Sequence, residues 1–328
     1  MKSFISLAGA LLVAFMAGSS ANGQSYPSRP VRILSGIPLG GGPGDLAVRG
    51  AVEVLSQALG QPFVVEARVG AEGLIAGEAC ARAAPDGYLL CFLDGYEIAL
   101  NPSIRVKMPY DGVRDLTPVI HLGYGPAAIL VHPSVPANSL KELFDLAKSK
   151  PGTVTWGSSG LASPGNLYIE WLKNAKGIVF HNIPYKSSLQ GMQALLAGEI
   201  QVTTYTAAAV APNVKAGKLR ALAVPTSERL PILPDVPTFK EAGMELAIIT
   251  WYGIMAPVAT PKEIVQRVNA TIARDLFGNA MLVEKFLNKP GTSVLAPAGG
   301  SVEAFAQFVK DQREMFSSVV KITGVRVQ

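Results

Sequence analysis

The sequence has few of the residues that build metal centres or nucleic-acid surfaces. Three histidines and two cysteines occur in 328 residues. His121, His132 and His181 have no ligand spacing between them, so we expect neither a metal nor a cofactor. Charged residues make up 16% of the chain, and its formal net charge of +5 includes no Lys/Arg run. We therefore do not expect nucleic acid as a partner.

The patterns of common enzyme sites are also missing. The segment from Gly157 to Gly160 is not a Gly-x-Ser-x-Gly elbow, and no histidine has an obvious acidic partner. The glycine-rich stretch that ends at Asp45 lacks the Gly-Lys-Ser/Thr end of a Walker loop, and a dinucleotide fingerprint needs glycine where Asp45 stands. Because no nucleophile–base pair is visible, we do not expect an enzyme.

An apolar run near the N-terminus has the character of a targeting signal. Lys2 precedes the apolar residues 4–18, a stretch too short for a comfortable membrane span, and small residues follow it. Ala21 and Gly23 fill the small-residue positions of a signal-peptidase site. We expect residues 1–23 to be a signal peptide that is cleaved after Gly23, so that the mature protein is exported. No later run is long enough to span a bilayer.

The two cysteines allow two interpretations. Cys80 falls near the end of a predicted helix, and Cys91 falls in the strand that follows it. An oxidising compartment permits a disulfide between them. We favour two buried free thiols, with a helix-to-strand disulfide as the alternative.

The glycine-rich stretch from Pro38 to Asp45 is the feature around which the chain is organised. It follows an apolar run typical of a strand, Val31–Leu34, and precedes a helical pattern, Leu46–Leu59. Glycines leave backbone N–H groups unobstructed, and a helix N-terminus attracts anions. The stretch is therefore a candidate carboxylate site with Asp45 as the helix N-cap. An ordinary strand–helix connection is the alternative.

Strands and helices alternate in the first part of the chain. Val31–Leu34, Pro62–Glu66 and Tyr88–Leu93 are predicted strands separated by helices, which indicates a parallel sheet in an α/β fold. Ligands collect at the carboxyl ends of such strands. Those ends are the glycine-rich stretch, Arg68–Gly73 and Asp94–Asn101.

Three charged residues lie in loops that follow predicted strands. Asp94 and Glu97 follow the third predicted strand, and we expect them to be exposed on the surface. If they face a cleft instead, they favour a ligand with a cationic or hydroxyl group at that end. Lys186 follows Tyr185 just before a predicted helix, where it is either a solvated lysine or a ligand contact.

The alternation restarts between two apolar crossings. Val119–Val131 is expected to cross to a second domain, and Ile248–Met255 is expected to return. Between them, Ser139 opens a helix with a capping box, and Ser163 is the expected cap of another. Thr260–Glu263 is a further predicted capping box.

The loop at Ser158 and Ser159 follows a predicted strand in this second half. We interpret its hydroxyl and backbone groups as donors aimed at an anion rather than as a nucleophile. Trp156 and Trp251 are expected in the core rather than against a ligand.

A series of short motifs, in order and at characteristic spacing, resembles one known family. The motifs are Tyr26–Arg32, Pro38–Asp45 with one extra residue, Leu59–Pro62, Val64–Glu66, Ala84–Tyr88, Asn101-Pro102, Pro109–Asp111, Trp156–Gly160, Pro184–Lys186, Gly217–Val224, Pro234–Thr238, Ala256-Pro257 and Thr260–Val265. The chain is similar over essentially its whole mature length to the periplasmic solute receptors of tripartite tricarboxylate transporters, the TctC or Bug (Bordetella uptake gene) family.

The resemblance implies a type II periplasmic-binding-protein fold, in which two α/β domains close on a ligand in the cleft between them. The first domain would comprise residues 24–123 and 249–328, and the second residues 124–248. Backbone N–H groups and hydroxyls would hold a small organic carboxylate. By position, the ligand-binding residues would be Leu39, Gly40, Gly41, Gly42, Asp45, Asp94, Gly95, Ser158, Ser159, Ser163, Tyr185, Lys186, Ser187 and Tyr205.

The implied function is capture of a di- or tricarboxylate or an aromatic acid in the periplasm. The receptor, expected to be a monomer, would deliver it to membrane transporter subunits of the TctA/TctB type. A ligand-sensing adaptor for a membrane signalling kinase, without transport, is the alternative.

Some positions depart from the family pattern around the pocket. Asp94-Gly95 replace small hydroxyl residues, Ser187 replaces a glycine, and a pocket-facing acid after the strand Ile200–Thr204 is replaced by Tyr205. Loss of that acid argues against an α-amino acid, and a tyrosine there favours an aromatic or larger carboxylate.

Overall fold

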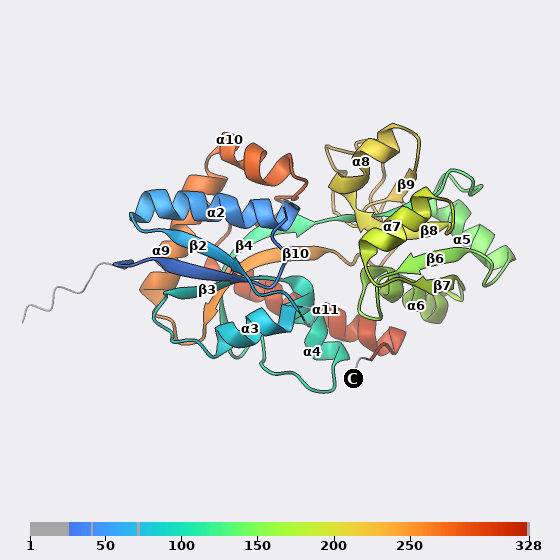
Figure 1. Ribbon diagram of the computed structural model, residues 1–328. Helices are drawn as coiled ribbons and strands as arrows, with labels where there is room; N and C mark the ends of the chain where they lie inside the picture. The colour runs from blue at the N-terminus through green and yellow to red at the C-terminus, as the bar shows by residue number, and fades with distance from the viewer. Residues whose placement is uncertain (1–25, 41, 71–72, 327–328) are drawn as a thin grey trace, which may run out of the picture.

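The computed structural model describes residues 26–326 apart from residue 41 and residues 71–72. The predicted signal peptide and Gly41 therefore lie outside the described residues. The described chain forms two lobes, each built on a five-stranded sheet with helices packed around it (Figure 1). This mixed architecture confirms the α/β prediction.

In the first sheet, one strand runs antiparallel to the others. β1 pairs in parallel with β2 and β3, while β10 runs antiparallel to both β3 and β4. In spatial order the strands are β2 (Phe63–Ala67), β1 (Val31–Ser35), β3 (Leu89–Asp94), β10 (Thr250–Pro257) and β4 (Leu116–Gly125).

The second sheet repeats this plan. β6 pairs in parallel with β7 and β8, while β5 runs antiparallel to both β8 and β9. In spatial order the strands are β7 (His181–Pro184), β6 (Thr155–Ser158), β8 (Val202–Thr206), β5 (Ala127–Val131) and β9 (Arg220–Ala223).

Helices connect the strands and cover them. Alternate residues of β3 belong to different core clusters, Cys91 and Leu93 to one and Leu90 and Phe92 to another, so both faces of the sheet are buried. The α-helices are α2 (Pro43–Leu59), α3 (Leu74–Ala81), α4 (Asn101–Ile104), α5 (Leu140–Ser149), α6 (Pro164–Lys176), α7 (Ser188–Leu196), α8 (Ala207–Lys215), α9 (Lys262–Ile272), α10 (Ala280–Val283) and α11 (Val302–Thr323), and the π-helical turns are η2 (Tyr96–Leu100), η3 (Ala273–Phe277) and η4 (Glu284–Asn288). Among the described helices, none is both long enough and apolar enough to cross a membrane.

The chain passes between the sheets at two places. Pro126 alone separates β4 of the first sheet from β5 of the second, within the segment Val119–Val131 that the sequence predicted as a crossing. The return follows a long connection after β9 and enters β10. There the buried hydroxyl of Tyr168 in α6 donates to the Ile248 carbonyl and accepts from the Ile248 N–H, both at 2.8 Å. This pair of hydrogen bonds fixes the start of the return.

Two of the predicted helix caps are confirmed. The Ser139 hydroxyl accepts from the Glu142 N–H, while the Glu142 carboxylate accepts from the N–H of Asn138, the residue before the cap. The Ser163 hydroxyl accepts from the Asn166 N–H at the start of α6.

The predicted cap at Asp45 is wrong. Helix α2 begins at Pro43 with Gly42 as its N-cap, because proline lacks an N–H and needs no partner in the first turn. Asp45 therefore lies inside that turn, where it accepts from Arg49 Nε at 2.8 Å. One helical turn separates the two side chains, so they are natural partners.

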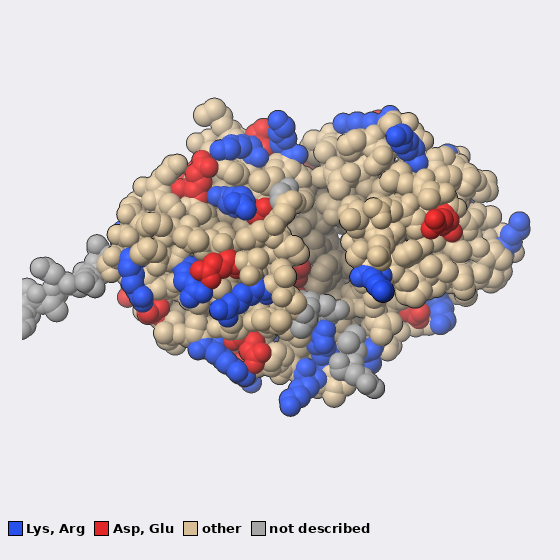
Figure 2. Space-filling view, viewed as in Figure 1, with Lys and Arg blue, Asp and Glu red and all other residues tan. Residues whose placement is uncertain are grey.

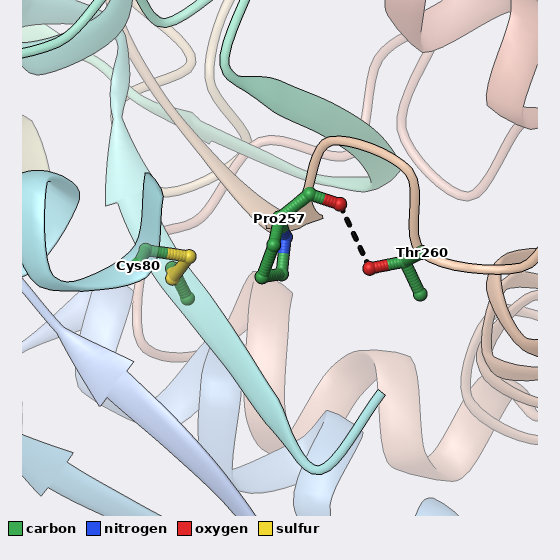
Figure 3. Close-up of a disulfide and its surroundings, with 4 residues drawn as sticks. Cys80, Pro257 and Thr260 are labelled. Atoms are coloured by element: carbon green, nitrogen blue, oxygen red, sulfur yellow. Dashed lines mark hydrogen bonds between the residues drawn. A yellow bond between two sulfur atoms is a disulfide. The ribbon is translucent and has the colours of Figure 1, made fainter. Parts of the chain in front are cut away.

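The predicted capping box at Thr260 is also wrong. Its hydroxyl donates to the Pro257 carbonyl at 2.7 Å and closes the turn that ends β10, so α9 begins after Pro261 (Figure 3). Ala259 in this turn has a φ of 69°, a left-handed conformation.

The cysteines form a disulfide, so the preferred prediction of free thiols is wrong (Figure 3). Cys80 in α3 and Cys91 in β3 have Cα atoms 6.2 Å apart. That separation is within the range that disulfides require. Helix α3 packs on β3, which brings the two residues together although the sequence gives no measure of that distance.

Trp156 and Trp251 are fully buried, which confirms the expected core positions. Trp251 belongs to an aromatic group around His121, whose ring centroid lies 4.7 Å from that of Tyr124 and 5.0 Å from that of Phe308. Neither ring nitrogen of His121 has a hydrogen-bond partner among the described residues. Burial lowers the pKa of His121 to about 3.

Substitution of His121 by leucine should make the protein less sensitive to acid. The unfolded histidine takes up a proton below its ordinary pKa, whereas the buried ring stays neutral until a much lower pH. This group alone should therefore reduce the free energy of unfolding by about 2.5 kcal/mol between about pH 7 and about pH 4.5. Urea unfolding of the wild-type protein and of His121→Leu at the two pH values measures this loss of unfolding free energy. An equal loss in the two proteins would contradict the claim that buried, neutral His121 causes it.

Reduction of the disulfide should lower stability. The bond joins residues 11 positions apart. Closing a loop of that size in the unfolded chain is worth about 3 kcal/mol. Urea unfolding with and without a thiol reductant should show this loss. The double variant Cys80→Ala, Cys91→Ala should not respond to the reductant, and an equal response in both proteins would show that the effect has another origin.

Candidate functional site

A cavity of about 410 Å³ lies between the two lobes. Figure 2 shows the hollow that separates them. The walls come from the loops that follow β1, β2, β3 and β6, so both sheets contribute through the carboxyl ends of their strands, as the α/β pattern predicts. The lining residues are Gly36, Ile37, Pro38, Val69, Gly70, Gly73, Asp94, Tyr96, Glu97, Asn101, Ser159, Ala162, Ser163 and Pro164.

The wall from the first sheet carries two acids that are held in a tight turn. Asp94 Oδ1 accepts from the N–H groups of Tyr96 and Glu97, at 2.9 and 3.0 Å. Glu97 Oε2 accepts in return from the Asp94 N–H at 3.1 Å. These bonds turn the chain directly from β3 into η2 and direct Glu97 back toward the sheet.

The expected surface exposure of these acids is therefore wrong. Glu97 is 2% exposed, and Asp94 is partly buried at the cavity. Glycines from two other loops make room for the Glu97 carboxyl, because a Cβ at either Gly36 or Gly73 would collide with Oε1. Gly73 also has a φ of 86°, which other residues rarely adopt.

The electrostatic environment of Glu97 disfavours its charged form. Burial is the main cause, and the neighbouring Asp94 carboxylate adds to it, so the pKa of Glu97 is raised well above its ordinary value. The hydrogen bond from the Asp94 N–H opposes this shift. Glu97 Oε1 has no hydrogen-bond partner among the described residues.

The wall from the second sheet is the start of α6. The Ser163 hydroxyl accepts from the N–H groups of Asn166 and Ser159 and donates to the Gly160 carbonyl at 2.7 Å. One side chain thus caps the helix and holds the loop that precedes it. The positive end of the helix dipole lies at this wall, where it attracts anions.

Three of the sequence-predicted residues line the cavity: Asp94, Ser159 and Ser163. Two others lie beside it. Ser158 is buried, and its hydroxyl donates to Asn182 Oδ1 at 2.7 Å. Gly95 lies against the Trp251 indole, where a Cβ would collide with the ring.

The glycine-rich stretch lies mostly outside the cavity lining. Gly36, Ile37 and Pro38 line it, while Leu39, Gly40 and Gly42 continue toward α2 without joining the lining, and Asp45 is buried beside Arg49. Gly41 lies outside the described residues. The roles predicted for these residues stay predictions.

The loop Tyr185–Ser187 adjoins the second wall without lining the cavity. The Tyr185 N–H donates to the Ser158 carbonyl at 2.8 Å, and Ser187 caps α7. Lys186 is exposed, whereas Tyr205 on β8 is partly buried against a core cluster. Their predicted ligand contacts also stay predictions.

Several lining residues were missed as individuals. Most of them lie in the segments that the strand-end rule identifies, Arg68–Gly73 and Asp94–Asn101. Pro38 belongs to the predicted glycine-rich stretch, and Ala162 lies in the loop between Ser159 and Ser163, while Gly36, Ile37 and Pro164 are neighbours of predicted segments. The described residues contain no group of three His, Cys, Asp or Glu side chains that could hold a metal ion.

Comparisons with known proteins agree on one family. The family described as "Tripartite tricarboxylate transporter family receptor" matches residues 47–325. Protein BugT of Bordetella pertussis is 31% identical, and the alignment covers 100% of this chain and 99% of BugT.

Solved structures have the same fold. R. palustris Rpa4515 with adipate has a TM-score of 0.78 at 32% identity, and 92% of this chain and 99% of that one are covered. The periplasmic binding protein BugD has a TM-score of 0.75 at 29% identity, with 92% and 100% covered. MatC from Rhodopseudomonas palustris with bound malate has a TM-score of 0.74 at 28% identity, with 90% and 100% covered.

Replacement of Ser163 by alanine should loosen the second wall as well as the helix. Loss of an N-cap costs about 1 kcal/mol. Ser301 caps α11 in the same way but holds no cavity loop, so Ser301→Ala is a matched control. Both variants should be less stable in urea. In hydrogen-exchange measurements, the Ser159 amide hydrogen should exchange faster in Ser163→Ala but not in Ser301→Ala. Equal exchange rates in the two variants would contradict the role of Ser163 in holding the loop.

Proposed function

The chain belongs to the family of tripartite tricarboxylate transporter receptors, and on this basis we propose that it captures a small organic carboxylate in the periplasm for uptake. The observation that carries the proposal is the cavity whose walls come from both sheets. Movement of one lobe against the other would enclose a solute there.

The chemistry of the two walls supports a carboxylate ligand. The first turn of α6 offers the positive end of a helix dipole, and the loop that Ser163 holds in place supplies the Ser159 hydroxyl. Two of the similar structures contain the dicarboxylates adipate and malate. We propose that a carboxylate of the solute lies against this wall.

The domain division follows the crossings of the chain. We propose that residues 24–123 and 249–328 form one domain and residues 124–248 the other, with hinges near Pro126 and Ile248. Residues 1–23 would be the signal peptide, cleaved after Gly23 for export to the periplasm.

The predicted ligand residues outside the present lining would act in the closed form. We propose that closure brings the glycine-rich loop, the Tyr185–Ser187 loop and Tyr205 toward the solute. Ligand binding favours closure only to the extent that the solute binds the closed state more tightly.

Membrane transporter subunits of the TctA/TctB type would then receive the solute from the receptor, which we propose to act as a monomer. The family description favours transport over the alternative role as a sensing adaptor for a membrane kinase. The structural relative BugD is described as a periplasmic binding protein, and MatC has malate bound, in accordance with a receptor that performs no catalysis.

A calorimetric and thermal-shift screen of di-, tri-, aromatic and amino-substituted carboxylates tests this function. A ligand present at roughly 100 times its Kd should raise the free energy of unfolding by about 2.7 kcal/mol. Uncharged amides of the hits are the matched controls and should bind weakly. If a well-folded sample binds none of the acids, or converts one to a product, the receptor function proposed here is contradicted.

A further inference from the structure

The backbones of the two lobes meet at a point outside the cavity lining. Gly291, which follows η4 in the first lobe, lies against Ala208 in the first turn of α8 in the second lobe. In Figure 1, α8 lies on the side of the second lobe that faces α10. A Cβ added to Gly291 would lie 2.1 Å from the Ala208 Cβ and 3.4 Å from its Cα. The lobes therefore approach so closely here that position 291 has no room for a side chain.

The first-lobe side of this contact is firmly held. Ser293 and Tyr124 of β4 exchange N–H and carbonyl groups, with both hydrogen bonds at 2.8 Å. The Thr292 N–H donates to the Leu287 carbonyl at 2.8 Å, and the Thr292 hydroxyl donates to the Pro43 carbonyl at 3.3 Å. The segment that carries Gly291 is thus fixed to β4, to η4 and to the start of α2.

The second-lobe side of the contact is tied to a crossing between the lobes. The Ala207 N–H, next to Ala208, donates to the carbonyl of Pro126 at 2.9 Å. Pro126 joins the two sheets, and Tyr124 precedes it by two residues. Both partners of the contact are therefore anchored within two residues of this crossing. When lobes turn about a crossing, the atoms beside it move least, so a contact at this place can persist while the cavity walls move.

We propose that Gly291 is a positioning residue, and that its contact with Ala208 is the fulcrum on which the lobes turn and which sets how the two cavity walls face the solute. This inference rests on the proposed function, in which the solute is enclosed between the lobes. Glycine is needed at position 291 for two separate reasons. Its φ of 96° is one that other residues rarely adopt, and a side chain would force the lobes apart.

Gly291→Ala should therefore change the orientation of the lobes even without a solute. Double electron–electron resonance between spin labels on Gln57→Cys in α2 and Gln193→Cys in α7, both exposed, measures the distance between the lobes. The mean distance should shift in Gly291→Ala. Gly217→Ala beyond the far end of α8 is the matched control, because its φ of 70° is also left-handed but a Cβ there meets no atom within 4 Å. It should leave the distance unchanged.

The affinity for a carboxylate should respond in the same way. The probe is the acid that binds most tightly in the thermal-shift screen, and calorimetry should show roughly 10-fold weaker binding to Gly291→Ala than to the wild-type protein. Gly217→Ala should bind the probe like the wild-type protein. Ala208→Val, which enlarges the other partner without straining the backbone of Gly291, should also shift the distance and weaken binding.

A second substitution separates the contact from general destabilisation. Ala208→Gly removes the colliding Cβ and leaves the Cα at 3.4 Å, an ordinary contact. The double variant Gly291→Ala, Ala208→Gly should recover the distance and affinity of Ala208→Gly alone. It should remain less stable in urea than Ala208→Gly, because the strained φ is still present.

The other outcomes contradict defined parts of the account. An unchanged distance in Gly291→Ala, or a shift that Ala208→Gly does not relieve, would overturn the fulcrum. A relieved shift with unchanged affinity would overturn its role in positioning the walls. Absence of binding by every carboxylate to the folded wild-type protein would contradict the receptor function, whereas the distances in the solute-free protein would still decide whether the contact sets the lobe orientation.

Discussion

Helix α6 is the element on which the arrangement of the two lobes depends. Its N-terminus forms one wall of the cavity, and in its middle Tyr168 holds both backbone groups of Ile248 where the chain returns to the first sheet. Near its end, Asn174 Nδ2 donates to the last carbonyls of α11, those of Ile322 and Thr323. One helix therefore links a wall of the cavity, the return crossing and the C-terminal helix.

This arrangement gives the cavity two chemically different ends. The capped start of α6 presents a helix dipole, while the first sheet presents the partly buried Asp94 and the buried Glu97. Because each wall belongs to a different lobe, the closure that we propose would change the distance between the two ends. A solute with complementary groups at both ends would stabilise the closed form more than one that satisfies a single wall.

Much of the fold could be predicted from the sequence, because strand periodicity and glycine-bearing loops are local signals. The strand pattern located the cavity loops at strand ends, and local capping motifs identified the Ser139 and Ser163 caps. The burial of Glu97 could not be predicted, since it depends on glycines in two other loops. The disulfide could not be predicted either, because it depends on how α3 packs on β3. The start of α2 was misplaced because Pro43 at the first helical position outweighed the preference of Asp45 for a cap.

The most direct test of this account is a crystal structure of the protein with the tightest-binding carboxylate found in solution. The account predicts that the solute lies in the cavity between the lobes, with a carboxylate at the first turn of α6. A solute bound outside this cavity, or one with no carboxylate at the first turn of α6, would contradict it.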